Sequence, residues 1–228
     1  MVWLLALAIA PGVFWLWYFL RRDRLRPEPR HLVGRVFALG AAAAVAAGGL
    51  EAGTFALRPL EISAPFLPSS VVAATIVGLI EEAVKLAALY VGIFRHVQFD
   101  EVIDGIIYAV AASLGFATVE NVAYVLQGGV GVGLLRALLS VPGHAFFGAV
   151  MGFYVGVARF APRPWPWLGV ALLAAAASHA AYDAAVFTGR WVALLVIPVV
   201  VLLWRASLHY VRRAQIMDTA RRSTPPAP

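Results

Sequence analysis

The sequence has no cysteine, only one lysine and few charged residues of any kind. The lack of cysteine excludes disulfides, thiolate metal sites and a cysteine nucleophile. Charged residues make up 13% of the 228 residues and hydrophobic residues 62%, and the mean hydropathy is +0.83. Because so few polar residues cannot cover a soluble core, this composition indicates an integral membrane protein. The sequence shows no internal repeat, so an inverted-repeat transporter has no support.

The apolar stretches predict an all-α, polytopic bundle of about seven transmembrane helices with short loops. We expect one transmembrane domain over residues 1–210, followed by a flexible cytoplasmic tail over 211–228. The expected helices cover about residues 3–20, 34–57, 69–94, 103–126, a segment from after Gly133 to about 158, 166–187 and 191–204.

Glycine and proline predict where these helices pack closely, bend or end. The Ala/Gly-rich second helix should pack tightly, because small residues let backbones approach. The stretch Gly128–Gly133 predicts a short, flexible connection on the outer side. Pro142 should bend or break the first third of the fifth helix.

The arginines predict how the chain is oriented in the bilayer. A basic stretch, Arg21–Arg26, follows the first helix instead of preceding it, which predicts an outer N-terminus and a cytoplasmic C-terminus. The seven-helix path leaves only Arg58, Arg136 and Arg190 on the outer side. The net charge of +6 therefore reflects membrane orientation, and we expect no nucleic-acid partner. Tryptophans near the expected helix ends favour the same path: Trp3, Trp15, Trp17, Trp165, Trp167, Trp191 and Trp204.

The third expected helix carries charge inside an apolar run, at Glu81, Glu82 and Lys85. A charged side chain near the bilayer centre costs about 2.5 to 3.5 kcal/mol on insertion scales, so this cluster suggests a functional site. Residues i and i+4 share a helix face, which aligns Glu81 with Lys85. Glu82 is rotated by about 100° from Glu81, so we expect the two carboxylates to point apart and to have different roles. An internally neutralised structural pair is the alternative.

The next three expected helices each carry polar residues at a compatible depth. These are Glu120 with Asn121, then His144, then His179 with Asp183 at the i, i+4 spacing. Glu81, Glu120, His144 and His179 lie about 9 to 18 Å below the outer helix ends, at about 1.5 Å per residue. Each alone is explained by interhelical hydrogen bonding, but together they predict one site. Asp104 lies near an inner helix end, where capping explains it.

Carboxylates and histidines without cysteine can activate water in two ways. A carboxylate acts as a general base, or histidines and carboxylates bind a metal such as zinc. The sequence lacks a His-Glu-x-x-His motif, a Gly-x-Gly-Asp motif beside Tyr182-Asp183, and a serine in a Gly-x-Ser-Gly setting. These absences disfavour three other classes of intramembrane protease. A proton- or metal-ion-coupled transporter and a non-catalytic scaffold stay open as alternatives.

The motif Glu81-Glu82-Ala83-Val84-Lys85 resembles the Glu-Glu-x-x-Lys motif of the PrsW family of intramembrane proteases, within the CAAX-protease and bacteriocin-processing superfamily. Asp104-Gly105 with Gly115–Asn121, then His144, then the His-x-x-x-Asp motif at 179–183 are similar to further family motifs in the same order. The resemblance covers about residues 69–188, the expected catalytic core. The chain departs from the CAAX-protease branch, which usually has a histidine where Glu120 stands, and this argues against prenyl-protein processing.

The resemblance implies an endopeptidase that hydrolyses a peptide bond within or beside the membrane. We assign Glu81 as the general base oriented by Lys85, and Glu82 as a second carboxylate or proton relay. His144 and His179 would position water or stabilise the oxyanion. The expected catalytic residues are Glu81, Glu82, Glu120, His144, His179 and Asp183, with Lys85 and Asn121 as orienting residues.

Cofactor and partners follow from the same resemblance. No cofactor is predicted by the base mechanism, whereas the zinc alternative would use Glu81, Glu120, His144 and His179 as ligands. The implied substrate is a single-span membrane protein such as an anti-sigma factor. It would be cut on its outer side, as the first step of regulated proteolysis in a bacterial plasma membrane.

Overall fold

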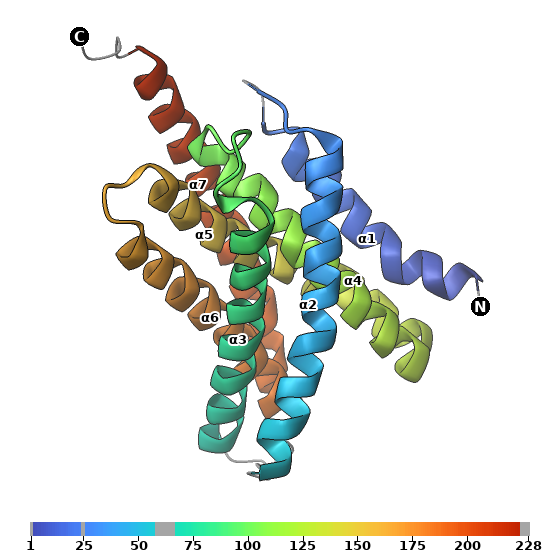
Figure 1. The fold of residues 1–228 in the computed structure, drawn as a ribbon. Helices are drawn as coiled ribbons and strands as arrows, with labels where there is room; N and C mark the ends of the chain where they lie inside the picture. The colour runs from blue at the N-terminus through green and yellow to red at the C-terminus, as the bar shows by residue number, and fades with distance from the viewer. Residues whose placement is uncertain (1, 24–25, 58–66, 224–228) are drawn as a thin grey trace.

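The computed structural model describes residues 2–23, 26–57 and 67–223, and within them it is helical without strands (Figure 1). The expected all-α architecture is therefore confirmed. The long helices are α1 (Val2–Leu20), α2 (Arg30–Leu57), α3 (Leu67–Leu89), α4 (Val102–Leu135), α5 (Val141–Phe160), α6 (Pro164–Thr188) and α7 (Val196–Ser223). A short π-helical turn, Tyr90–Phe94, follows α3, and another, Arg136–Ser140, precedes α5. A 3-10 turn, Arg190–Leu195, precedes α7.

Within the described residues, five helical stretches are long and apolar enough to cross a membrane. One of them, Val102–Phe160, contains both α4 and α5. The helix α3 is not among the five, and it carries the three charged residues Glu81, Glu82 and Lys85. Length and composition alone therefore support several spans, without giving the count of seven.

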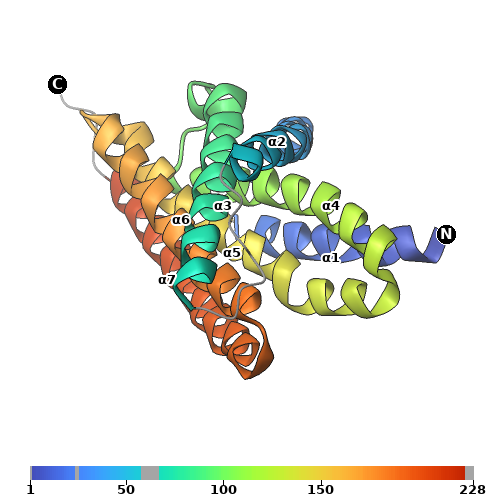
Figure 2. The same ribbon diagram turned by 90° about the horizontal axis from the view of Figure 1, so that it is seen from below.

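Several helix ends lie at two opposite ends of the bundle, whereas the start of α1 and the end of α4 project to one side (Figure 1). The turns after α1, α3 and α5 and the end of α7 lie at one end, where Figure 1 has its top. The end of α2, the start of α3 and the α6–α7 turn lie at the other. Seen along the bundle, α5 lies between α4 on one side and α6 and α7 on the other (Figure 2).

The helix α4 is the centre of the fold, because every residue from Val102 to Ala117 is buried. Glycines let two neighbours approach its backbone directly. A Cβ atom built on Gly152 of α5 would lie 2.3 Å from the carbonyl oxygen of Gly105, and one on Gly40 of α2 would lie 1.9 Å from that of Ala112. The close packing predicted for the Ala/Gly-rich second helix is thus observed. Backbone contacts hold α2 and α5 at fixed positions around α4.

The connection expected at Gly128–Gly133 is present as a tight turn at Gly129, and the residues on both sides of it are helical. Within this stretch only Gly129 has a left-handed backbone, with φ of 69°, which glycine adopts without steric cost. The chain reverses at this turn, because Arg136 lies 3.0 Å from Glu120, and it then continues through the π-helical segment Arg136–Ser140 into α5. Pro142 lies in the first turn of α5, where its missing N–H leaves no hydrogen bond unmade. A π-helical turn therefore precedes the proline, and Pro142 does not break the helix that was expected to bend there.

The flexible tail expected from residue 211 is not observed, because α7 continues as a helix to Ser223. Its last turns pack against the bundle, with Val211, Ala214 and Asp218 buried. Asp218 accepts hydrogen bonds from the backbone N–H groups of Val102 and Ile103, at 2.6 and 3.1 Å. The end of α7 thus caps the start of α4. Residues 224–228 lie outside the described residues, as does most of the expected outer loop around Arg58.

Candidate active site

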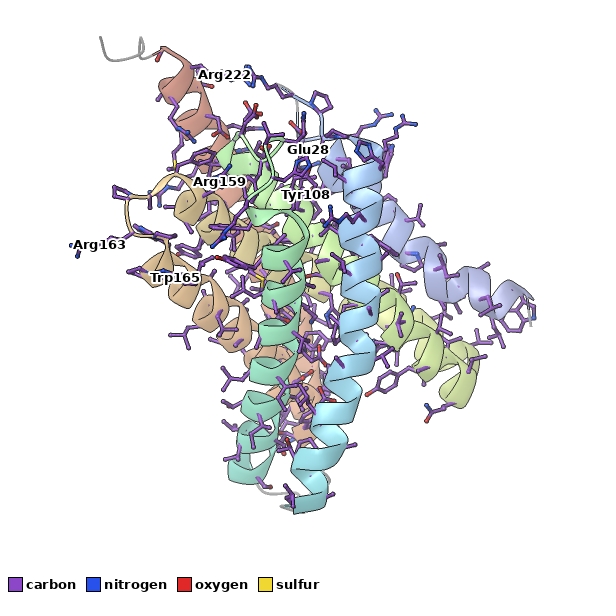
Figure 3. The ribbon with its side chains drawn as sticks, viewed as in Figure 1. Glu28, Tyr108, Arg159, Arg163, Trp165 and Arg222 are labelled. Carbon is purple, nitrogen blue, oxygen red and sulfur yellow. The ribbon has the colours of Figure 1, made fainter. Side chains whose placement is uncertain are left out.

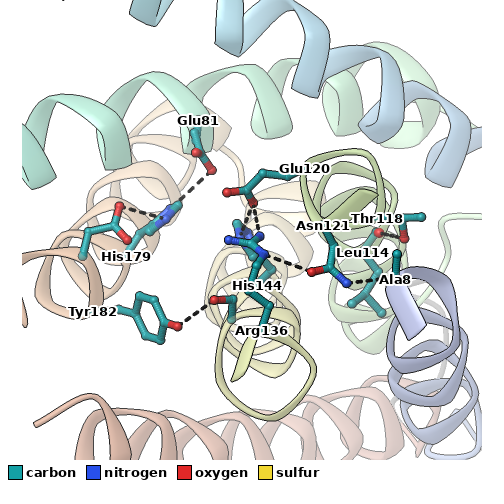
Figure 4. Close-up of polar contacts among 12 residues, drawn as sticks. Ala8, Glu81, Leu114, Thr118, Glu120, Asn121, Arg136, His144, His179 and Tyr182 are labelled. Atoms are coloured by element: carbon teal, nitrogen blue, oxygen red, sulfur yellow. Dashed lines mark hydrogen bonds and ion pairs between the residues drawn. The ribbon is translucent and has the colours of Figure 1, made fainter. Parts of the chain in front are cut away.

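The charged and polar residues expected to form one site come together where α3, α4, α5 and α6 meet (Figure 4). The helix α3 contributes Glu81, Glu82 and Lys85, and all three are buried. His144 of α5 and His179 of α6 are 4% and 3% exposed. Chain segments far apart in sequence therefore build a single polar cluster inside the apolar bundle.

Lys85 lies at the centre of this cluster and is fully buried. Its Nζ atom donates to Glu81 Oε2 at 3.0 Å, to Glu82 Oε1 at 2.8 Å and to His144 Nδ1 at 3.1 Å. The ammonium also lies 4.0 Å from the centre of the Phe116 ring, in cation–π contact. One cation thus compensates two carboxylates, as buried charges require.

The expectation that Glu82 points away from Glu81 is wrong. Glu82 precedes Lys85 by three residues and Glu81 precedes it by four, and both spacings place a side chain beside Lys85 on an α-helix. The long lysine side chain reaches between them. The two carboxylates still differ, because the side chain of Glu82 is 0% exposed and that of Glu81 is 7% exposed.

His179 is held by carboxylates on both sides of its ring. Its Nδ1 atom lies 2.9 Å from Glu82 Oε1 and 3.8 Å from Glu81 Oε2. Its Nε2 atom lies 3.4 Å from Asp183 Oδ2, which places the predicted partner nearby but farther away than Glu82. The ring also stacks on Phe147, with centroids 4.7 Å apart. Glu82, rather than Asp183 alone, therefore sets the orientation of His179.

His144 joins the lysine cluster to Glu120. Because an ammonium group only donates, His144 accepts from Lys85 at Nδ1, and its Nε2–H faces Glu120. The Nε2 atom lies 3.0 Å from Glu120 Oε2. Glu120 is thus part of the cluster, as expected, at its more exposed edge, with 22% of its side chain exposed.

Arg136, expected only as one of the arginines on the outer side, also belongs to this cluster. A guanidinium nitrogen of Arg136 lies 3.0 Å from Glu120 Oε2, and its Nε donates to Asn121 Oδ1 at 3.0 Å. Asn121 in turn donates to the backbone oxygen of Ala8 in α1, at 2.8 Å. Asn121 is thus connected to the cluster through Arg136 (Figure 4). In the sequence, Arg136 is a lone arginine between two apolar runs, and this charge could have indicated a place in the cluster.

Glu51 of α2 was also missed. Its Oε1 atom is buried and has no hydrogen-bond partner within the described residues. The carboxyl group is in electrostatic contact with Glu81, Glu120, His179 and Asp183. A carboxylate in the apolar run Gly49–Gly53 was the signal in the sequence. Its helix therefore contributes a further acidic group to the cluster.

A metal fits the donor groups of this cluster in part. Glu81, His144 and His179 are buried and each offers a ligand atom, all within 4.8 Å of one another. Two histidines and one carboxylate form a ligand set used by catalytic zinc sites. Glu120, the fourth ligand expected for zinc, is not in this group. Lys85 competes for the same lone pairs, because it already donates to Glu81 and His144.

Asp104 lies outside the cluster, as expected for a helix-capping residue. The backbone N–H groups of Asp100 and Glu101 donate to its Oδ2 atom at 2.8 and 2.7 Å. Asp104 and Glu101 form a capping box at the start of α4. The separation of Asp104 from the expected catalytic residues agrees with the sequence analysis.

Comparisons with known proteins match nearly the whole chain to one family. The family model described as "PrsW family intramembrane metalloprotease" matches residues 28–206. The chain is 34% identical to Protease PrsW of Bacillus subtilis over 218 residues, which covers 94% of this chain and 97% of that protein. It is 35% identical to Protease PrsW of Geobacillus kaustophilus, covering 93% and 92%, and 32% identical to that of Clostridioides difficile, covering 92% and 90%. No solved structure matches the chain.

Proposed function

The chain belongs to the PrsW family of intramembrane proteases, and from this membership we propose that its lysine-centred cluster hydrolyses a peptide bond in a membrane-anchored protein. Membership makes the chain a multi-pass membrane protein and a peptide hydrolase. The observation that carries the proposed chemistry is Lys85. Its ammonium joins Glu81, Glu82 and His144 by hydrogen bonds inside the bundle.

In the proposed mechanism, Glu81 is the general base. A base needs a carboxylate that water can reach, and Glu81 is the less buried of the two glutamates. Glu82 Oε1 is already shared between Lys85 and His179, so Glu82 holds these two groups in position. Lys85 balances the charge of both carboxylates.

The reaction would proceed by attack of water on the peptide carbonyl. Glu81 takes a proton from water as the oxygen bonds to the carbonyl carbon. The negative charge that develops on the carbonyl oxygen is stabilised by His179 or Lys85, both fixed before the reaction. The C–N bond then breaks as Glu81 passes its proton to the leaving amine. Asp183 orients His179 from the other ring nitrogen.

Substitution of each glutamate tests these roles. We expect Glu81→Gln to reduce cleavage of a single-span reporter by at least about 100-fold, since a positioned base contributes roughly that much or more. Glu82→Gln should reduce activity by misplacing His179. Asp100→Asn is the matched control, because Asp100 is an exposed acidic residue paired with Arg26 outside the cluster. Full activity in Glu81→Gln would exclude Glu81 as the base.

A zinc-dependent version is the second candidate, favoured by the ligand set Glu81, His144 and His179. When bound, zinc would polarise the carbonyl and activate water. Purified protein treated with a chelator decides between the versions. Unchanged activity supports the base mechanism, and loss of activity that zinc restores supports the metal. Metal content measured on the same sample checks that chelation was complete.

For substrate and topology, we propose a single-span substrate of the anti-sigma-factor type, cut on its outer side in regulated proteolysis. The proposed topology has seven spans, α1 to α7, with the N-terminus outside and the C-terminus in the cytoplasm. The resemblance of the motifs supports the substrate class, and the arginine asymmetry supports the topology. Comparing the membrane proteomes of cells with active protein and with Glu81→Gln protein tests the substrate. A set of shortened membrane proteins seen only with active enzyme would support it, and identical proteomes would contradict it.

A further inference from the structure

A second cluster of acidic side chains lies at the opposite end of α4 from Glu120. Asp23 and Glu28 come from the α1–α2 connection, and Asp104 from the first turn of α4. They are 5%, 8% and 0% exposed, and each offers one carboxylate oxygen within 4.8 Å of the other two. Sixteen residues of helix separate Asp104 from Glu120, about 24 Å at about 1.5 Å per residue. The cluster is therefore separate from the proposed active site.

No basic side chain within the described residues forms an ion pair with these three carboxylates. Two arginines at this end of the bundle have other partners, since Arg26 pairs with Asp100 and Arg222 pairs with Glu101. Three buried carboxylates without a cation are costly, because like charges repel and water is excluded.

Hydrogen bonds hold one oxygen of each carboxylate. The backbone N–H of Glu28 donates to Asp23 Oδ2 at 3.0 Å, and two backbone N–H groups hold Asp104 Oδ2. The Tyr108 hydroxyl donates to Glu28 Oε2 (Figure 3). Outer hydrogen bonds of this kind orient the ligands of metal sites.

Two further oxygens of the cluster are left without a donor. Asp23 Oδ1 and Asp104 Oδ1 are buried and have no hydrogen-bond partner in the described part of the chain. The carboxyl groups of Glu28 and Asp104 also face each other closely. Carboxylate oxygens only accept, so facing oxygens need either a shared proton or a cation between them.

We propose that Asp23, Glu28 and Asp104 bind a divalent cation that prefers oxygen ligands, of the Mg²⁺, Ca²⁺ or Mn²⁺ class. An all-oxygen ligand set suits these cations, whereas zinc sites favour nitrogen and sulfur. The bound cation would join the α1–α2 connection to the start of α4. Through the contacts of Asp218 with Val102 and Ile103, the same position also meets α7.

Binding is tested with Mn²⁺ on the full chain in detergent, with free Mn²⁺ followed by electron paramagnetic resonance. We expect about one Mn²⁺ per chain, displaced by Mg²⁺ or Ca²⁺. Asp23→Asn and Asp104→Asn should each weaken binding at least tenfold, because each removes a charged ligand. Glu120→Gln, the matched control, removes a carboxylate charge about 24 Å away along α4 and should bind as the unaltered chain does. Binding that persists in His144→Ala protein is assigned to this cluster and not to the active site.

Thermal unfolding gives a second readout that does not depend on how tightly the variants bind. In chelator, Asp23→Asn protein should melt at the same temperature as the unaltered chain or higher, because one repelling charge is gone. In millimolar Mg²⁺ or Ca²⁺ the unaltered chain should melt at a higher temperature than the Asp23→Asn protein, since a ligand that binds only the folded state stabilises it. If an Asn variant does not fold, Glu28→Gln replaces it.

Two outcomes would overturn the proposal. One is that the unaltered chain takes up none of the three cations at millimolar concentration, which would mean that a shared proton compensates the cluster. The other is that the Asp23→Asn/Asp104→Asn double variant binds Mn²⁺ as tightly as the unaltered chain, which would place the cation elsewhere.

Discussion

Lys85 is the residue on which the polar cluster depends for its charge balance. Its ammonium lies within 3.1 Å of Glu81, Glu82 and His144, and it is fully buried. Removing one member of a buried charge network leaves the others uncompensated, which costs more than never having built the network. The stability of α3 against its neighbours therefore depends on the same residue as the proposed chemistry.

Lys85→Met tests this dependence. We expect it to destabilise the protein by about 3 to 5 kcal/mol, because two buried carboxylates lose their cation. The measurement is unfolding in detergent followed by circular dichroism. The matched control is the triple variant Glu81→Gln/Glu82→Gln/Lys85→Met, which should recover much of the loss because no unpaired charge remains. A Lys85→Met protein as stable as the unaltered chain would show that the carboxylates are already compensated otherwise.

The residue types of the cluster could be predicted from the sequence, but their contacts could not. Charge in an apolar run is visible in one dimension, which is how Glu81, Lys85 and His179 were found. Arg136 and Glu51 were missed because their partners lie on other helices. A contact such as Lys85 to His144 spans 59 residues, so it depends on how α3 packs on α5.

At the scale of the helices, close backbone contacts fix α5 against α4. Gly152 and Gly105 face each other, and a Cβ on Gly152 would meet backbone atoms at 2.3 and 2.6 Å. Backbone atoms cannot turn aside as a side chain can. His144 lies two turns earlier on α5, so this contact also positions the histidine.

Gly152→Ala should therefore destabilise the protein by about 1 to 3 kcal/mol and reduce cleavage, because overpacking forces α5 away from α4. Gly48→Ala is the matched control, since nothing lies within 4 Å of its Cβ position. That variant should be as stable as the unaltered chain or more stable by up to about 1 kcal/mol, because alanine favours helix. The unfolding temperature measures the stability of each variant, and reporter cleavage measures its activity. Equal stability of the two variants would contradict the packing argument.

The positions of the helices could be predicted well, and their ends less well. Apolar runs between arginines and prolines place α1, α2 and α6 within a few residues of the expected ranges. Glycine located the turn at Gly128–Gly133 but not its length, because only Gly129 leaves the helical conformation in that stretch. The polar end of α7 was expected to be a flexible tail, but Asp218 finds partners on α4. Tertiary contacts of this kind override composition, and the sequence does not show them.

At the scale of the whole molecule, α4 carries a different polar cluster near each end of its buried part. Glu120 belongs to the proposed active site, and Asp104 to the proposed cation site. Figure 1 shows the start of α4 at the same end as the end of α7, which the arginine asymmetry assigns to the cytoplasm. In the proposed topology, hydrolysis therefore occurs toward the outer side and the cation binds on the inner side.

The lack of cysteine makes this topology directly testable, because a single introduced cysteine is the only thiol. Val97 and Trp191 are similarly exposed, at 77% and 73%, and three helices, α4 to α6, separate them. An odd number of crossings places them on opposite sides. In intact cells, a membrane-impermeant maleimide should label Trp191→Cys and Trp3→Cys but not Val97→Cys, and after lysis it should label all three. If Trp3→Cys and Val97→Cys react alike in intact cells, an even number of crossings separates them, so α1, α2 and α3 do not all span the bilayer and the seven-span topology is wrong.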